Sequence, residues 1–120
     1  MAVRLQLPPQ YTNMNETATL SAGPHKINVV DAATMVLTLP TLSASTHGTV
    51  VHIVNMSANP NMTIIPATGQ TIQFEDASTN DNIGPDTGVA RGDYVTLSST
   101  SSITTWSVVD MFGAWKTATP

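Results

Sequence analysis

The chain has 120 residues, no cysteine and a formal net charge of −4; 41% of its residues are hydrophobic, 5% aromatic and 10% charged. This length suits one domain with a single core, and the lack of cysteine excludes disulfides, zinc–thiolate sites and thiol nucleophiles. Because globular proteins usually contain about 25% charged residues, the surface is poor in charge. Such a surface favours protein–protein association, so we expect a homo-oligomer.

The few charges are unevenly distributed along the chain. Five acidic residues and Arg91 fall between positions 75 and 93, whereas the charges elsewhere cancel. Because no cluster of Lys and Arg accompanies aromatic residues, the sequence does not favour a nucleic-acid partner. The N-terminus lacks the apolar run of a signal peptide and no stretch approaches ~20 apolar residues, so we expect neither export nor a membrane span.

Residues 1–15 form the first predicted segment, an extended N-terminal arm. The segment combines apolar residues with the pair Pro8-Pro9, and this composition favours extended backbone. Apolar side chains on such an arm tend to dock on another surface, so we predict that the arm contacts a partner. The predicted contact residues on the arm are Arg4, Leu5, Leu7 and Tyr11.

Residues 16–112 form the predicted all-β domain. Short runs of alternating hydrophobic and polar residues are separated by Gly, Pro and Asn, as in sandwiches and barrels, and no helical period of useful length occurs. We therefore expect a single antiparallel β-sandwich or barrel-like domain, a jelly-roll being one topology that fits. The predicted strands are 17–20, 26–30, 35–39, 49–55, 62–65, 71–74, 94–97 and 104–109.

The run 49–55 is the predicted centre of the sheet. Val51 and Ile53 would point to one face, and Val50 and Val54 to the other together with His52. This pattern predicts a strand that is covered on both sides.

The segment 75–91 shows no alternation and is predicted to form a long, solvated acidic loop. Asp76, Ser78 and Asn80 alternate as at the start of a calcium-binding loop, but Asp81 stands where such a loop needs glycine. A solvated loop without an ion is therefore the favoured interpretation.

The two tryptophans are predicted to play different roles. Trp106 shares the face of Val108 in the last predicted strand and is expected in the core. Trp115 lies in the predicted C-terminal tail, residues 113–120, and is the candidate anchor to a neighbouring subunit.

No residues form a catalytic, cofactor-binding or metal-binding pattern, so we predict that the chain is not an enzyme. His25, His47 and His52 lack the spacing of a metal-ligand set. No serine stands in a nucleophile elbow. The predicted strands from 35 to 74 contain no Asp or Glu, which disfavours a glycosidase built on the sheet face.

From Met35 onward, the chain resembles a β-rich module of tailed-bacteriophage virion proteins, which occurs in fibre segments and in capsid decoration (cement) proteins. The matching segments are LTLPTLSASTHGTVVHIVN at 37–55, MTIIPATGQTI at 62–72, GDYVTLSST at 92–100 and TWSVVD at 105–110. They consist of turn and core residues, so the resemblance implies a fold and a setting and no chemistry. The interval between Phe74 and Gly92 is longer and more acidic than in the module.

The resemblance implies a structural virion protein. The favoured interpretation is a capsid decoration (cement) protein, a homotrimer made in the host cytoplasm and located on the capsid exterior, which stabilises the head by binding between major capsid subunits. The alternative is a receptor- or glycan-binding component of a tail fibre or baseplate. The expected partners are the major capsid protein and further copies of the chain, with no cofactor, nucleic acid or membrane.

Overall fold

The computed structural model describes residues 11–30, 34–44, 48–57, 61–74, 82–86, 88–99 and 103–118. These residues form strands and turns, and no helix occurs among them, which confirms the all-β prediction. The strands are β1 (Thr12–Met14), β2 (Ala18–Thr19), β3 (His25–Val29), β4 (Met35–Thr38), β5 (Val50–Asn55), β6 (Met62–Ile65), β7 (Thr71–Gln73), β8 (Asn82–Pro85), β9 (Tyr94–Ser98), β10 (Thr105–Phe112) and β11 (Trp115–Ala118).

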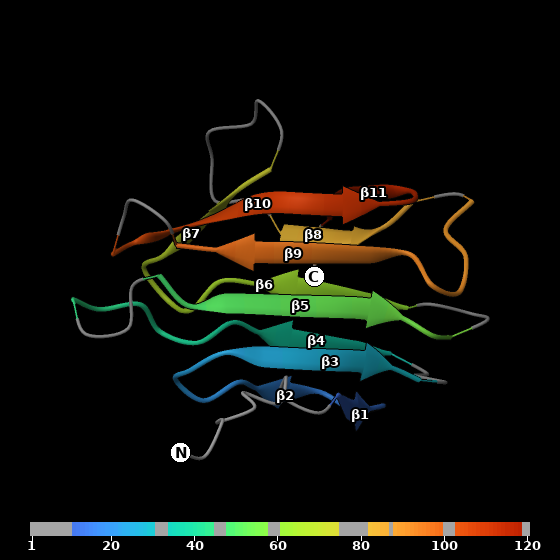
Figure 1. The fold of residues 1–120 in the computed structure, drawn as a ribbon, viewed down its shortest axis with the longest axis horizontal. Helices are drawn as coiled ribbons and strands as arrows, with labels where there is room; N and C mark the ends of the chain where they lie inside the picture. The colour runs from blue at the N-terminus through green and yellow to red at the C-terminus, as the bar shows by residue number, and fades with distance from the viewer. Residues whose placement is uncertain are drawn as a thin grey trace, which may run out of the picture.

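The strands form two sheets, one in front of the other in Figure 1. Sheet A has the strand order β1-β3-β5-β9-β10-β7 and faces the viewer, and sheet B has the order β11-β8-β6-β4-β2 and lies behind it. Strand β5 lies inside sheet A, which confirms its predicted central position. Its outer face is not covered, however, because Val50 is 42% exposed.

The chain alternates between the sheets from β1 to β6, and this makes both sheets mixed. Each connection crosses to the other sheet and the next one returns, so β1, β3 and β5 pair in parallel in sheet A. Strands β2, β4 and β6 do the same in sheet B. Antiparallel pairs occur where β8, β9, β10 and β11 join the sheets. The prediction of an antiparallel domain is therefore wrong, because alternating hydrophobicity identifies strands and says nothing of their relative direction.

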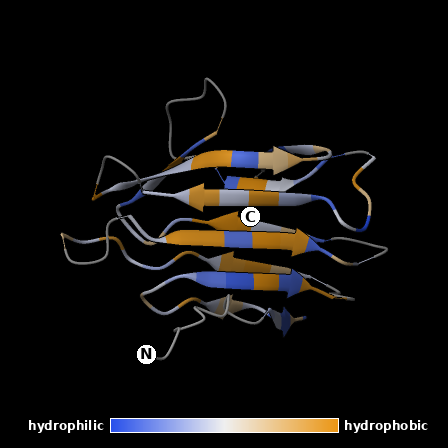
Figure 2. Cartoon of the chain, viewed as in Figure 1, coloured by the Kyte–Doolittle hydropathy of each residue, from blue (hydrophilic) through white to orange (hydrophobic). Residues whose placement is uncertain are grey.

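A single hydrophobic core fills the space between the sheets. Figure 2 shows hydrophobic and hydrophilic residues alternating along the central strands, as expected when one face of each strand is buried. Full burial of a Val, Leu or Ile side chain stabilises the fold by about 1.5–3 kcal/mol. The core includes Trp106, as predicted, and its other members are Leu20, Ile27, Val29, Met35, Leu37, Leu39, Leu42, Val51, Ile53, Met62, Ile64, Ile72, Phe74, Ile83, Val95, Leu97 and Trp115.

Each of the eight predicted segments contains a strand, and three further strands were not expected from the sequence. They are β1 in the predicted arm, β8 in the predicted loop 75–91 and β11 in the predicted tail. The loop prediction is wrong at β8, because Ile83 is buried there and the strand pairs with β6 and β11. The candidate calcium ligands at 76–81, and His47, lie outside the described residues.

A buried polar cluster fixes residues 90–93 to the end of β5. The side chain of Asn55 is fully buried and donates to the carbonyl oxygens of Ala90 (3.1 Å) and Ser57 (3.3 Å). Asp93 is 6% exposed, and its Oδ2 accepts a bond of 2.8 Å from the backbone N–H of Ala90. Gly113 lies against this carboxylate with φ +95°, so a side chain at position 113 would overlap Asp93.

Candidate functional site

The outer face of sheet A has a row of polar side chains that crosses four adjacent strands. Lys26 of β3 pairs in register with His52 of β5, and His52 pairs with Thr96 of β9. Thr96 in turn pairs with Asp110 of β10. The next residue on β5, Ile53, is fully buried between the sheets, so this row points away from the core. We call Lys26, His52, Thr96 and Asp110 the polar row.

Four rings cross the same face and form an aromatic row. The ring centres of Tyr11 and His52 are 6.0 Å apart, and those of His52 and Tyr94 are 5.2 Å apart. Tyr94 stacks on Phe112 with 6.1 Å between centres and 21° between planes. Such spacings fall within the favourable range for aromatic pairs. We call Tyr11, His52, Tyr94 and Phe112 the aromatic row.

The two ends of the aromatic row are open to solvent. Phe112 is 62% exposed and Tyr11 is 44% exposed. The ammonium group of Lys26 lies 5.4 Å from the centre of the Tyr11 ring, a cation–π geometry. Large exposed apolar side chains that gather on one face of a sheet are typical of a binding surface.

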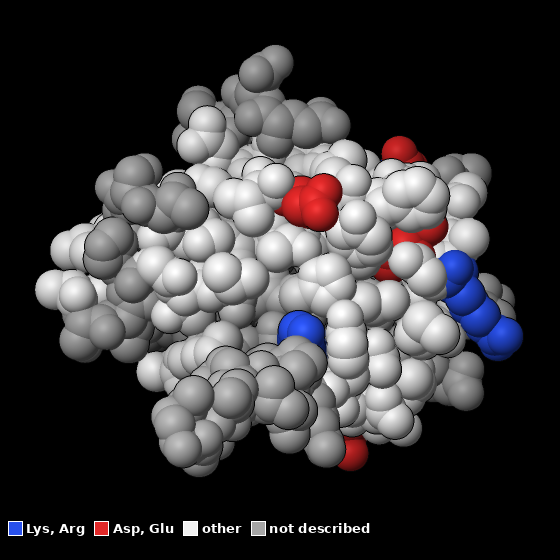
Figure 3. All heavy atoms as spheres, in the orientation of Figure 1, with Lys and Arg blue, Asp and Glu red and all other residues white. Residues whose placement is uncertain are grey.

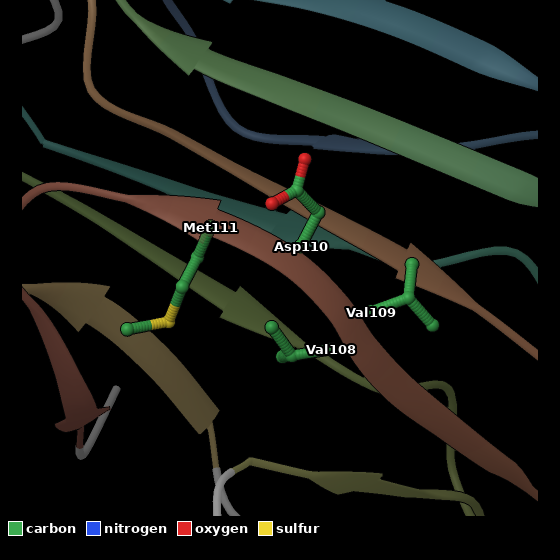
Figure 4. A pocket seen from close by; sticks show the side chains of 4 residues that line it. All are labelled: Val108, Val109, Asp110 and Met111. Carbon is green, nitrogen blue, oxygen red and sulfur yellow. The ribbon is translucent and has the colours of Figure 1, made fainter.

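A β-bulge in β10 places Asp110, the last member of the polar row, and Phe112, the last member of the aromatic row, on the outer face. Val108 pairs with Leu97 and Asp110 with Thr96, so Val109 is the extra residue. Figure 4 shows the Asp110 side chain pointing to the opposite side from Val108 and Met111. These four residues of β10 also line a shallow pocket at the bulge.

The charged ends of the polar row act on the histidine between them. Burial, followed by the positive charge of Lys26, lowers the pKa of His52 below its ordinary value of 6.5, and Asp110 opposes this shift. The Nδ1 atom of His52 lies 2.6 Å from the hydroxyl oxygen of Thr96. The Tyr94 hydroxyl donates a long bond, 3.5 Å, to Asp110 Oδ2. Figure 3 shows this side of the molecule as mainly uncharged, with a few separate acidic and basic groups.

The structure places the predicted contact residues in different surroundings. Tyr11 belongs to the aromatic row. Trp115 is only 6% exposed, and its Nε1 donates a bond of 2.9 Å to the carbonyl oxygen of Phe112. Its predicted contact with a neighbouring subunit stays a prediction, and its burial in this chain disfavours it. Arg4, Leu5 and Leu7 lie outside the described residues.

The sequence did not identify the other members of the two rows as site residues. Alternation along 49–55 does place His52 on the face opposite Ile53. Its neighbours Lys26 and Thr96 come from strands far away in the sequence, and only the strand order and register bring the three together.

The described residues bring together no group of three His, Cys, Asp or Glu side chains able to hold a metal ion. In the same part of the chain, no helix could cross a membrane. No family model matches the chain, and comparisons with curated proteins and with solved structures likewise find no match.

Proposed function

We propose that this chain is a non-enzymatic binding protein that decorates the capsid of a tailed bacteriophage and binds the major capsid protein. The observation that carries the proposal is the position of Tyr11. This residue ends the aromatic row and directly follows residues 1–10, which belong to the predicted arm. The predicted arm therefore joins the described domain at its exposed aromatic face.

The edge position of β1 adds to this argument. Among the described residues, β1 pairs with β3 on one side only, and β2 is likewise the last strand of sheet B. Edge strands leave backbone N–H and C=O groups free for pairing with another chain. A partner bound beside the arm could thus contact the exposed ring of Tyr11 and add a strand to the edge that β1 forms among the described residues.

The mechanism is adhesion by many copies. Each copy buries a modest area, and the free energies add over a shell because every bound copy holds its neighbours in place. The core between the two sheets keeps the binding surface in one shape. Because binding needs no reacting group, this proposed function requires no cofactor.

A truncation tests this proposal. Removing residues 1–10 leaves Tyr11 and strand β1 in place, so we expect a folded domain that no longer co-sediments with capsids of its own virus. The control is Lys116→Ala, which alters an exposed side chain of β11 near Asp86, 3.9 Å away, and should leave capsid binding unchanged. Undiminished capsid binding by the truncated chain would contradict the proposal.

Copy number distinguishes the main proposal from the alternative. A decoration protein approaches the stoichiometry of the major capsid protein in purified particles, whereas a tail component is present in far fewer copies. Quantitative mass spectrometry of purified particles measures this ratio directly.

The alternative is a receptor- or glycan-binding component of a tail fibre or baseplate, and the Tyr94–Phe112 pair favours it. Two stacked rings beside the carboxylate of Asp110 offer an apolar surface and a hydrogen-bond acceptor, the combination that a sugar ring requires. Chemical-shift changes at Phe112 on titration with oligosaccharides would support this function. Their absence, together with capsid-level copy number, would exclude it.

A further inference from the structure

We propose that two copies of this chain pair through the outer face of sheet A, about a two-fold axis that runs parallel to the strands between β5 and β9. This inference does not rest on the proposed function: the dimer uses the outer face of sheet A, and the capsid contact then falls to the predicted arm and the edge strand β1. The argument starts from the polar row, whose two ends have opposite charges.

When two copies face each other, the polar row of one copy can be complementary in charge to the polar row of the other. Lys26 and Asp110 are three strand spacings apart, about 14 Å at roughly 4.8 Å per spacing. An axis along the strands, above the middle of the row, reverses the strand order of the facing copy. Lys26 of each copy then lies opposite Asp110 of the other, which gives two symmetric ion pairs.

The same charges exclude the perpendicular arrangement. A two-fold axis that crosses the strands directly above the polar row would place Lys26 opposite Lys26 and Asp110 opposite Asp110. Like charges brought together in an interface are repulsive. The polar row therefore selects one of the two symmetric ways of stacking two copies of sheet A.

The same pairing would also bury the exposed rings. Phe112 lies at the β10 end of the face, so the axis along the strands brings it over the β3 side of the other copy. That side presents Asn28 and Lys26, and Tyr11 lies beside Lys26. Phe112 and Tyr11 are the two most exposed rings of the aromatic row, and their burial is favourable by about 25 cal/mol per Å² of apolar surface.

The centre of the face suits the axis. Thr96 lies opposite His52 of the other copy there, so neither copy brings a fixed charge to the middle.

A second copy also accounts for more of the face than a glycan does. An oligosaccharide stacked on Tyr94 and Phe112 would make no contact with Lys26, at the other end of the row. A second copy of the chain would contact both ends of the polar row, Lys26 and Asp110. The resulting assembly has two-fold symmetry, in contrast to the trimer that the family resemblance implies.

Charge reversal tests the pairing in sedimentation equilibrium experiments. We expect the wild-type chain to be a dimer. Lys26→Glu and Asp110→Lys should each raise the dimer dissociation constant by roughly tenfold or more, because each creates two like-charge contacts. The double variant restores opposite charges and should return the dissociation constant to within about threefold of the wild type. Lys116→Glu, which reverses a charge on β11 in the other sheet, is the matched control.

A second variant guards against effects of charge on folding. Phe112→Ser removes an exposed ring and should weaken the dimer without lowering the urea midpoint of a diluted, monomeric sample. The proposal is overturned by a wild-type chain that is monomeric or trimeric, by single reversals that leave the dimer intact, or by a double variant that remains dissociated. A monomer that binds oligosaccharides through Phe112 would overturn it in favour of the glycan-binding function.

Discussion

His52 Nδ1 lies 2.6 Å from Oγ1 of Thr96, so an imidazole on β5 is hydrogen-bonded to a hydroxyl on β9 across the outer face of sheet A. Lys26 and Asp110 flank this pair on the neighbouring strands, and Tyr11 and Tyr94 lie against the ring. The pair therefore connects the protonation of one side chain to the stability of the sheet.

We predict that acid destabilises the fold through His52. Burial and Lys26 lower its pKa in the folded chain below 6.5, so the unfolded chain binds this proton more readily. The contribution of His52 to stability is complete above pH 6.5 and is lost as the pH falls through the folded-state pKa. Urea denaturation across this pH range measures the effect. His52→Gln should reduce the slope of the free energy of unfolding against pH, and an unchanged slope would contradict the prediction.

We predict that Gly113→Ala is strongly destabilising. The new Cβ would overlap the carboxylate of Asp93, and the residue would also have to adopt φ +95°. We expect a loss of about 2–4 kcal/mol in the free energy of unfolding. Gly69→Ala is the matched control, because its φ is +82° and its Cβ meets nothing within 4 Å. The free energy of unfolding of this control should fall only by the cost of a side chain at positive φ, about 1–2 kcal/mol.

We predict that Asn55→Ala destabilises the chain by about 1–3 kcal/mol, since it removes a fully buried amide that hydrogen-bonds to the backbone of Ser57 and to the carbonyl oxygen of Ala90. In a diluted, monomeric sample, Asn28→Ala removes an exposed bond to Asn13 and should change stability by less than about 0.5 kcal/mol. Chemical denaturation of both variants provides the comparison. Equal losses in the free energy of unfolding of the two variants would contradict the prediction, because the buried Asn55 bonds would then contribute no more than an exposed bond.

We predict that the bulge in β10 can be removed without disturbing the binding face. Deleting Val109 leaves Val108 opposite Leu97 and Asp110 opposite Thr96, which is a regular antiparallel ladder. The deletion variant should fold and keep Asp110 and Phe112 on the outer face. Deleting Met111 instead moves Phe112 to the core side and should lower the urea midpoint clearly. Similar midpoints for the two deletions would contradict the register.

Much of the fold follows from alternation in the sequence. The run at β5 predicts an inward face containing Val51 and Ile53, and Trp106 is in the core as its spacing indicates. Strand β8 was missed because only Ile83 is apolar between Asn82 and Gly84, and pairing with β6 and β11 compensates for the short run. Strand direction was missed because it depends on which sheet each connection enters.

The candidate site was predictable only at Tyr11. The composition of the arm identifies this residue, whereas Lys26, His52 and Asp110 come from separate strands and are ordinary surface residues in the sequence. Their alignment depends on the order β3-β5-β9-β10, and hydrophobic periodicity contains no information about strand order. The bulge at Val109 also shifts which residues of β10 face outwards.

The alternation of β1 to β6 between the sheets has a consequence for how the molecule can grow. Each circuit of the chain lays down one strand on each sheet beside the previous pair, as in coiled repeat proteins. Duplicating a circuit would lengthen the body at its β1–β2 end and leave the polar row on β3, β5, β9 and β10 in place. The length of the body could thus change without altering the register that aligns Lys26 with Asp110.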